Sequence, residues 1–255
     1  FNAYSHATGF GQVDALAAVR LAASWDDQAH TVSNTKEIVL SKSVKAAIPD
    51  NDVNGVFSSI NVSEDMNVER VDVTVNVTHP FVGDLQILLL SPAGTTSFLL
   101  WRPAQGALSA YGSSQHDIHF TFDSVLNWGE SSVGSWGLYI SDADQGATGT
   151  FNDWTLDLIG SPYSRDNTYV YTNEYPTVVA TDPSRAVLSD PDGGRNVLNA
   201  GALGLDNRLD LSGRSLSVLN GANLKIAAGT IIAEGIGGDG ADTLIANDLG
   251  SLLRG

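Results

Sequence analysis

Apolar and polar residues alternate through the middle of the chain, from about residue 32 to residue 159. In 71–78, four valines alternate with polar residues, which is the pattern of a strand with one buried face. Further apolar runs occupy 85–90 and 97–100, and a tight Ser-Pro-Ala-Gly-Thr turn separates them. Several short strands at this spacing predict an antiparallel β-sandwich or jelly roll.

A different periodicity marks the beginning of the chain. Val13, Ala17, Leu21 and Trp25 recur every fourth residue, which places them on one face of a helix. This is the one long helix that the sequence predicts. The fold expected is therefore mainly β, with one N-terminal helix.

The end of the chain carries a calcium-binding pattern. Residues 237–245 read Gly-Gly-Asp-Gly-Ala-Asp-Thr-Leu-Ile and fit the nonapeptide G-G-x-G-x-D-x-U-x at every fixed position. We expect the glycines to adopt positive φ and turn their carbonyls inward, and Leu244 to begin a strand of a parallel β-roll. Residues 246–254 keep the register and Gly255 would open a further repeat, which predicts a fragment that ends as a roll begins.

Composition agrees with calcium binding. The formal charge is −16, from 29 acidic and 13 basic residues, which argues against a nucleic-acid partner. Only six acidic residues are glutamate, and aspartate is the residue of turns and calcium loops. The chain has no cysteine, so bound ions could supply the cross-links of an extracellular protein. A halophilic or merely solubilising acidity stays open as the alternative. No apolar run approaches the ~18 residues of a membrane span, so none is expected.

Two sets of oxygen-bearing residues are candidate Ca²⁺ ligands. Loop aspartates of the sandwich can converge on one ion, with Asp84 and Asp142 the best members, although each could instead cap its own turn. In the roll, main-chain and carboxylate oxygens of the nonapeptide need a neighbouring turn to complete a site. The candidates are Asp50, Asp52, Asp84, Asp142 and Asp144 in the sandwich, and Gly237, Asp239, Gly240, Asp242, Asn247 and Asp248 in the roll.

Several segments in the middle of the chain resemble the P domain of kexin- and furin-type proprotein convertases. In that family the P domain follows a subtilisin-like catalytic domain, and residues 5–15 resemble the end of such a domain and its final helix. The two resemblances occur in the family's order. The P-domain segments are 47–51, 79–85, 91–95, 134–138, 141–142 and 149–156.

The last third of the chain resembles the stretch before the calcium roll of serralysin-type secreted proteases. The matching segments are 190–199, 207–211 and 229–238. Two departures from that family's pattern weaken the inference that its calcium ligands are present here. Asn196 stands where the family has a calcium-binding aspartate, and Glu234 lies one residue later than the family's glutamate. We thus expect four parts: the end of a catalytic domain in 1–31, a P domain in 32–161, a pre-roll β segment in 162–235, and a truncated roll in 236–255.

Catalytic machinery is not expected in this chain. The five histidines never form the H-E-x-x-H of a metalloprotease, and no serine lies in a G-T-S-type turn. The resemblances imply the non-catalytic, calcium-binding C-terminal portion of a secreted, extracellular subtilisin/kexin-like serine endopeptidase. Its partner would be the catalytic domain of the same chain, which it would help to fold, to stabilise and to be secreted.

The alternative is an extracellular adhesin or glycan-binding jelly roll that folds with calcium. Exposed tryptophans would favour this reading, and Trp101 and Trp128 lie near loops. Trp136 and Trp154 lie in strand patterns and are expected in the core. The Gly- and Ser-rich loop 102–115 is the segment most suited to contact a protein substrate or a cell-surface ligand.

Overall fold

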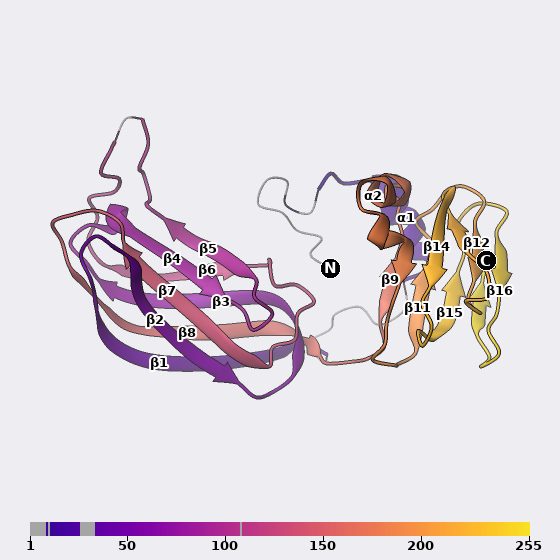
Figure 1. Ribbon diagram of the computed structural model, residues 1–255, viewed down its shortest axis with the longest axis horizontal. Helices are drawn as coiled ribbons and strands as arrows, with labels where there is room; N and C mark the ends of the chain where they lie inside the picture. Colours follow the sequence, from indigo (N-terminus) through magenta and orange to yellow (C-terminus); the bar gives the residue numbers. More distant parts are fainter. Residues whose placement is uncertain (1–8, 10, 26–33, 108) are drawn as a thin grey trace. The chain divides into compact units, whose positions relative to one another are not determined.

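The computed structural model describes residues 9, 11–25, 34–107 and 109–255, which form two compact units (Figure 1). The first unit contains residues 34–163 and the second contains 164–255 together with 12–25. Of the segment 5–15 that resembles the end of a catalytic domain, residues 5–8 and 10 lie outside the described residues.

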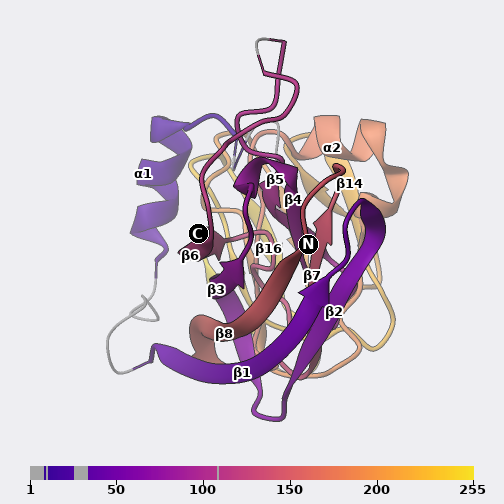
Figure 2. The same ribbon diagram turned by 90° about the vertical axis from the view of Figure 1, so that its left-hand side faces the viewer.

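The first unit is a sandwich of two four-stranded antiparallel sheets. One sheet has the order β1-β8-β3-β6 and the other β2-β7-β4-β5, and their strands can be followed in Figure 2. The elements are β1 (Lys36–Ile48), β2 (Asp52–Val62), β3 (Met66–Thr78), the 3₁₀ turn η1 (Val82–Asp84), β4 (Leu85–Leu90), β5 (Thr96–Trp101), β6 (Ile118–Ser124), β7 (Gly134–Asp142) and β8 (Gly149–Pro162).

The core of the sandwich lies between the inner faces of the two sheets. The four valines of β3 from Val71 to Val77 are fully buried, as their alternation predicts. Trp136 and Trp154 are also fully buried, which confirms that they belong to the core. Each satisfies its indole N–H: Trp136 Nε1 donates to the Ser132 carbonyl at 2.8 Å, and Trp154 Nε1 donates to Ser58 Oγ at 3.0 Å.

The second unit contains two smaller sheets. A parallel sheet has the order β17-β15-β11-β9, and a mixed sheet has the order β10-β14-β13-β12-β16. The elements are β9 (Thr168–Val170), α2 (Tyr175–Thr181), the 3₁₀ turn η2 (Pro183–Ala186), β10 (Val187–Leu188), β11 (Asn196–Asn199), β12 (Arg208–Asp210), β13 (Ser217–Leu219), β14 (Ala222–Ile226), β15 (Ile232–Ile236), β16 (Thr243–Ile245) and β17 (Leu252–Arg254).

The end of the second unit follows a coiled path between its two sheets. The chain leaves β15 in the parallel sheet, forms β16 in the mixed sheet and returns to the parallel sheet as β17. Leu244 in β16 is the parallel partner of Leu209 in β12, and Leu252 in β17 is the partner of Glu234 in β15. In the same way, β11 in the parallel sheet is followed by β12 in the mixed sheet, so the coil begins before the nonapeptide. The antiparallel hairpin β13–β14 interrupts the coil.

The helix expected near the N-terminus is present as α1 (Ala15–Ala23). Asp14 caps it, because its side chain accepts a hydrogen bond from the Ala17 N–H at 3.0 Å. The helix is shorter than its apolar pattern, since Val13 and Trp25 lie outside it. None of the helices in the described residues is both long and apolar enough to cross a membrane.

A second short helix, α2, was not predicted. Its Thr-Val-Val run is β-branched and reads as strand, whereas Pro176 suits the first turn of a helix. Tyr175 anchors α2, because its side chain is buried and its hydroxyl donates to the Asn223 carbonyl at 2.8 Å. The mainly β fold that the sequence predicts is confirmed.

Candidate metal sites

The pairing of β4 with β7 brings the two best aspartate candidates to one end of the sandwich. Asp142, the last residue of β7, is the partner of Leu85 in β4, and Asp84 directly precedes Leu85. The Ala143 N–H donates to the Asp84 carbonyl at 2.9 Å and joins the two segments. Both aspartates are buried, with exposed fractions of 6% for Asp84 and 0% for Asp142.

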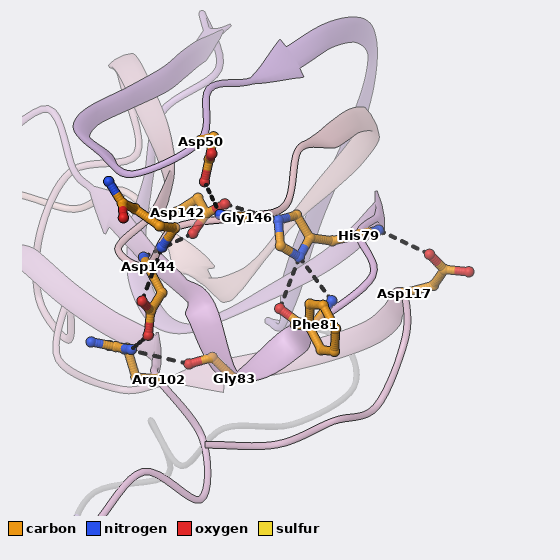
Figure 3. Close-up of polar contacts among 10 residues, drawn as sticks. Asp50, His79, Phe81, Gly83, Arg102, Asp117, Asp142, Asp144 and Gly146 are labelled. Carbon is orange, nitrogen blue, oxygen red and sulfur yellow. Dashed lines mark hydrogen bonds and ion pairs between the residues drawn. The ribbon is translucent and has the colours of Figure 1, made fainter. Parts of the chain in front are cut away.

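His79 contacts Asp142 at the buried side of this site (Figure 3). Its Nε2 lies 3.2 Å from Asp142 Oδ2, and neither side chain is exposed to solvent. An ionised carboxylate only accepts hydrogen bonds, so a proton on Nε2 satisfies both groups. Two further bonds hold the residue in place, because the His79 N–H donates to Asp117 Oδ1 at 2.9 Å and Nδ1 accepts from the Phe81 N–H at 3.1 Å.

Arg102 and Asp144 form the more accessible part of the site. Arg102 Nη2 lies 2.7 Å from Asp144 Oδ2, and the Asp144 N–H donates to Asp142 Oδ1 at 3.0 Å (Figure 3). The Arg102 Nε–H also reaches the Gly83 carbonyl at 3.5 Å. The guanidinium therefore supplies positive charge to a cluster of carboxylates, as a bound cation would.

The ionisation of Asp84 reflects this crowding. Burial raises the pKa of its carboxyl, and the negative charges of Asp142 and Asp144 raise it further. His79 and Arg102 lower the pKa, but the upward effects are larger. A carboxylate with a raised pKa gains from a nearby cation, because the cation offsets both the repulsion and the loss of hydration.

The other two sandwich candidates differ in what they contact. Asp50 Oδ1 accepts a hydrogen bond from the Gly146 N–H at 2.9 Å, which ties it to the loop that follows Asp144. Asp52 instead accepts from the main-chain N–H and side-chain amide of Asn54, both at 2.9 Å, and so caps its own turn. The structure therefore brings Asp84, Asp142 and Asp144 together and links Asp50 to them. Asp52 is the cross-strand partner of Asp142, but its side chain bonds within its own turn.

The sequence reasoning missed His79, Arg102 and Gly83 as parts of this site. A Cβ on Gly83 would lie 2.4 Å from the Ser113 nitrogen, so only glycine allows the loop 102–115 to pack there. The Val82 and Gly83 N–H groups donate to carbonyls of that loop at 2.8 and 2.9 Å. The available signal was the compact His79–Asp84 loop itself, in which a histidine and an aspartate flank a glycine.

In the second unit, Asp242 holds two consecutive coils together. Its Oδ1 accepts from the Asn207 N–H at 2.7 Å, and its Oδ2 accepts from the Gly238 N–H at 2.6 Å. Asp239 points to α1, where Arg20 Nε lies 2.6 Å from its Oδ2. The two carboxylates of the nonapeptide thus have different partners.

The nonapeptide glycines correct one expectation. None of Gly237, Gly238 and Gly240 has the positive φ that we expected from the pattern. Added Cβ atoms on Gly238 and Gly240 would instead lie 2.1 and 2.4 Å from the carbonyl oxygens of Leu203 and Leu205. These two glycines are needed because the preceding coil passes so close to them.

The turn that contains Asn247 and Asp248 does not join the nonapeptide turn. It follows β16, whereas residues 237–242 precede that strand. Asn247 donates its side-chain amide to the Ile232 carbonyl at 2.7 Å, and Asp248 is exposed and paired with Arg214. Across the described residues, no group of three or more His, Cys, Asp or Glu side chains is arranged to hold a metal ion.

The two positions that depart from the serralysin pattern have structural partners. Asn196 is buried and donates to the carbonyls of Gly193 and Ile231 at 3.2 and 3.0 Å. Glu234 Oε1 lies 2.5 Å from Arg254 Nε, in the neighbouring strand β17.

Comparison with known proteins identifies the sandwich. Residues 68–158, which include β4 to β7 and most of β3 and β8, match the family model described as proprotein convertase P-domain. The sandwich therefore contains a P domain. This confirms the resemblance found in the sequence, and the match covers the His79, Asp84, Arg102 and Asp142 cluster.

Curated relatives extend the similarity beyond the P domain. The chain is 31% identical over 203 residues to proprotein convertase subtilisin/kexin type 5 of Rattus norvegicus, which covers 73% of this chain and 10% of that protein. It is 31% identical over 182 residues to kexin of Saccharomyces cerevisiae, which covers 67% of this chain and 21% of that protein. The chain thus spans about a tenth of the first relative's length and about a fifth of the second's.

One solved structure supports the fold. The crystal structure of an Aeromonas sobria serine protease in complex with its chaperone aligns with a TM-score of 0.51 and 23% identity, over 61% of this chain and 31% of that one. At this identity the likeness concerns the fold of the aligned region.

Proposed function

We propose that this chain is the non-catalytic, calcium-binding C-terminal portion of a secreted subtilisin/kexin-like serine endopeptidase. Its role is to support the folding and stability of the catalytic domain and the secretion of the protease. The P-domain match and the similarity to a proprotein convertase and to kexin support this role. The alignments include about two thirds or more of this chain but only a minor part of each relative.

The observation that carries the calcium proposal is the burial of Asp84 and Asp142 side by side at the ends of paired strands. Hard cations such as Ca²⁺ take carboxylate and carbonyl oxygens from loops. Asp84, Asp142 and Asp144 offer carboxylates in two short segments, and the raised pKa of Asp84 shows that negative charge there is costly. To bind the ion, Asp144 would exchange Arg102 for calcium, and main-chain oxygens would complete the shell.

Calcium in the coil of the second unit is a separate part of the proposal. Asp242 already bridges the nonapeptide turn to Asn207 of the preceding coil. An ion bound by this carboxylate and by main-chain carbonyls of both turns would strengthen the same connection.

Thermal unfolding tests both parts of the calcium proposal. We expect millimolar calcium to raise the melting temperature relative to chelator. Asp84→Asn should abolish the gain of the sandwich, and Asp242→Asn that of the second unit. Asp153→Asn, on the exposed face of β8, is the matched control and should retain the full gain. An unchanged melting temperature on chelation would overturn the calcium proposal.

The role beside a catalytic domain needs its own experiment. The gene region upstream should encode the aspartate, histidine and serine motifs of a subtilisin-like domain in order. Expression of that longer protein with and without residues 34–163 should show loss of soluble, active protease when they are removed. A full yield without them would defeat the supporting role.

A glycan-binding or adhesive function is the second candidate, because aromatic side chains are exposed on one face of the sandwich. On the outer face of the sheet β2-β7-β4-β5, Phe57 is the partner of Tyr139, Tyr139 of Leu88, and Leu88 of Phe98. Phe98 packs edge-on against Trp101, at 5.5 Å between ring centroids. Aromatic faces of this kind stack against sugar rings or apolar protein surfaces. Binding of soluble oligosaccharides, lost in Trp101→Ala and retained in Trp128→Ala, would favour this function.

A further inference from the structure

Three aspartates stand side by side on the outer face of the sheet β1-β8-β3-β6. Asp72 in β3 is the direct cross-strand partner of Asp157 in β8 and of Asp123 in β6. The row faces outward, because the residues beside Asp72 in β3, Val71 and Val73, are buried in the core. Like charges that lie directly opposite each other destabilise strand pairing.

Two oxygens of this row are buried without a hydrogen-bond partner. They are Oδ1 of Asp72 and Oδ1 of Asp157, and no other side-chain nitrogen or oxygen of the described residues shares this condition. A buried polar atom that has lost water and gained no partner costs free energy, and more so when it carries charge. The repulsion in the row is therefore not relieved by solvent at these two atoms.

The groups around the pair add negative charge. From β1, Glu37 is close enough for its charge to raise the pKa of the Asp157 carboxyl. From β3 itself, Arg70 Nη2 lies 2.9 Å from Asp72 Oδ2, but its side chain is 51% exposed. Burial is the largest cause that raises the pKa of Asp157, followed by the charges of Glu37 and Asp72, whereas Arg70 lowers it.

In the neighbouring rows of this face the polar side chains pair with one another, so the unpartnered oxygens are confined to the aspartate row. In the next row the hydroxyls pair, with 2.8 Å between Ser41 and Thr155 and 2.8 Å between Thr74 and Thr121. One row further, the Asn76 amide donates to Asp153 Oδ2 at 3.1 Å.

We propose that the Asp123–Asp72–Asp157 row, with Glu37 beside it, is a pH-sensitive device that sets the strength of the β3–β8 pairing. When every member is ionised, the repulsion loosens the pairing of β3 with β8. When Asp157 takes up a proton, it donates a hydrogen bond to a neighbouring carboxylate and the pairing tightens. Since the folded state holds this proton more strongly than the unfolded chain, the stability contributed by the row falls as pH rises.

The test compares Asp157→Asn with Asp153→Asn, which removes an aspartate from the same strand and the same face. Melting temperatures are measured from about pH 8 to about pH 4.5, a range that spans ordinary and raised carboxyl pKa values. All samples contain chelator, so that calcium at the Asp84 cluster does not contribute. Asp84 is present in every sample, and its effect cancels in the differences.

We expect Asp157→Asn to melt about 3 °C above the unmodified chain at pH 8 and to lose this advantage at pH 4.5. Asp153→Asn should melt at or below the unmodified chain at every pH, with no such crossover. Carboxyl ¹³C NMR provides the second measurement and should place the midpoint of Asp157 above the ordinary range of an aspartate. A melting curve of Asp157→Asn that stays parallel to that of the unmodified chain, or an ordinary midpoint for Asp157, overturns the proposal.

Discussion

His79 and Asp142 form a fully buried pair, with 3.2 Å between Nε2 and Oδ2. They come from the loop after β3 and from the end of β7, which are 63 positions apart in the sequence. Asp142 also accepts from the Asp144 N–H, so this one carboxylate joins the histidine loop to the loop that follows β7. The pair is thus the internal support on which the more exposed Asp144 and Arg102 rest.

Removal of one partner of this pair should destabilise the sandwich strongly. In Asp142→Ala, the buried imidazole loses its acceptor and a cavity remains, which we expect to cost about 3 kcal/mol of the free energy of unfolding. Urea denaturation measures the loss. Asp117→Ala, which removes only the partner of the His79 main-chain N–H, should cost about 1 kcal/mol. An equal loss in both variants would contradict a special role of the buried pair.

Substitution of either core tryptophan should lower the free energy of unfolding more than substitution of an exposed one. Trp154→Phe leaves the Ser58 hydroxyl without its donor and reduces the volume that fills the core, at a cost of about 1–3 kcal/mol. Trp101→Phe is the matched control, because its ring is 57% exposed, and it should stay within about 0.5 kcal/mol of the unmodified chain. Denaturation followed by tryptophan fluorescence distinguishes the two outcomes.

Close approach in the second unit predicts a strong effect of one added methyl group. Gly238→Ala places a Cβ only 2.1 Å from the Leu203 carbonyl oxygen, so the two coils must separate. We expect a loss of about 1–3 kcal/mol in the unfolding of this unit. Gly106→Ala, where no atom lies within 4 Å of the added Cβ, should be close to neutral. Hydrogen exchange of the β16 amides reports on the coil directly, and unchanged protection in Gly238→Ala would refute the close contact.

The raised pKa of Asp84 predicts how stability changes with pH when calcium is absent. Because burial and the Asp142 and Asp144 charges raise its pKa in the folded state, the folded chain binds the proton more strongly than the unfolded chain. The stability contributed by this proton is present at acid pH and is lost as pH rises through the raised pKa. In chelator, Asp84→Asn should therefore gain in melting temperature relative to the unmodified chain as pH increases, whereas Asp52→Asn should not. A constant difference across pH would show that the Asp84 carboxyl titrates normally.

Local sequence determined the strands and the core of this protein. The period of two in β3 places every second residue inward, and from Val71 to Val77 each of these is a valine, because side chains alternate between the faces of any strand. The P-domain segments and the burial of Trp136 and Trp154 could also be read from the chain, since they depend on short motifs and strand position. The helix α2 could not, because its β-branched residues favour a strand and only packing through Tyr175 selects the helix.

Only the tertiary structure decided which polar residues meet. The sequence placed five aspartates in loops, but only the register of β7 against β4 brought Asp84 beside Asp142. The register of β7 against β2 makes Asp52 the cross-strand partner of Asp142, yet the Asp52 side chain bonds within its own turn. The same holds for Asp72 and Asp157, which alternation marks as outward-facing but only strand pairing sets opposite each other. Register depends on contacts summed over whole strands, so the residues of a site do not reveal it by themselves.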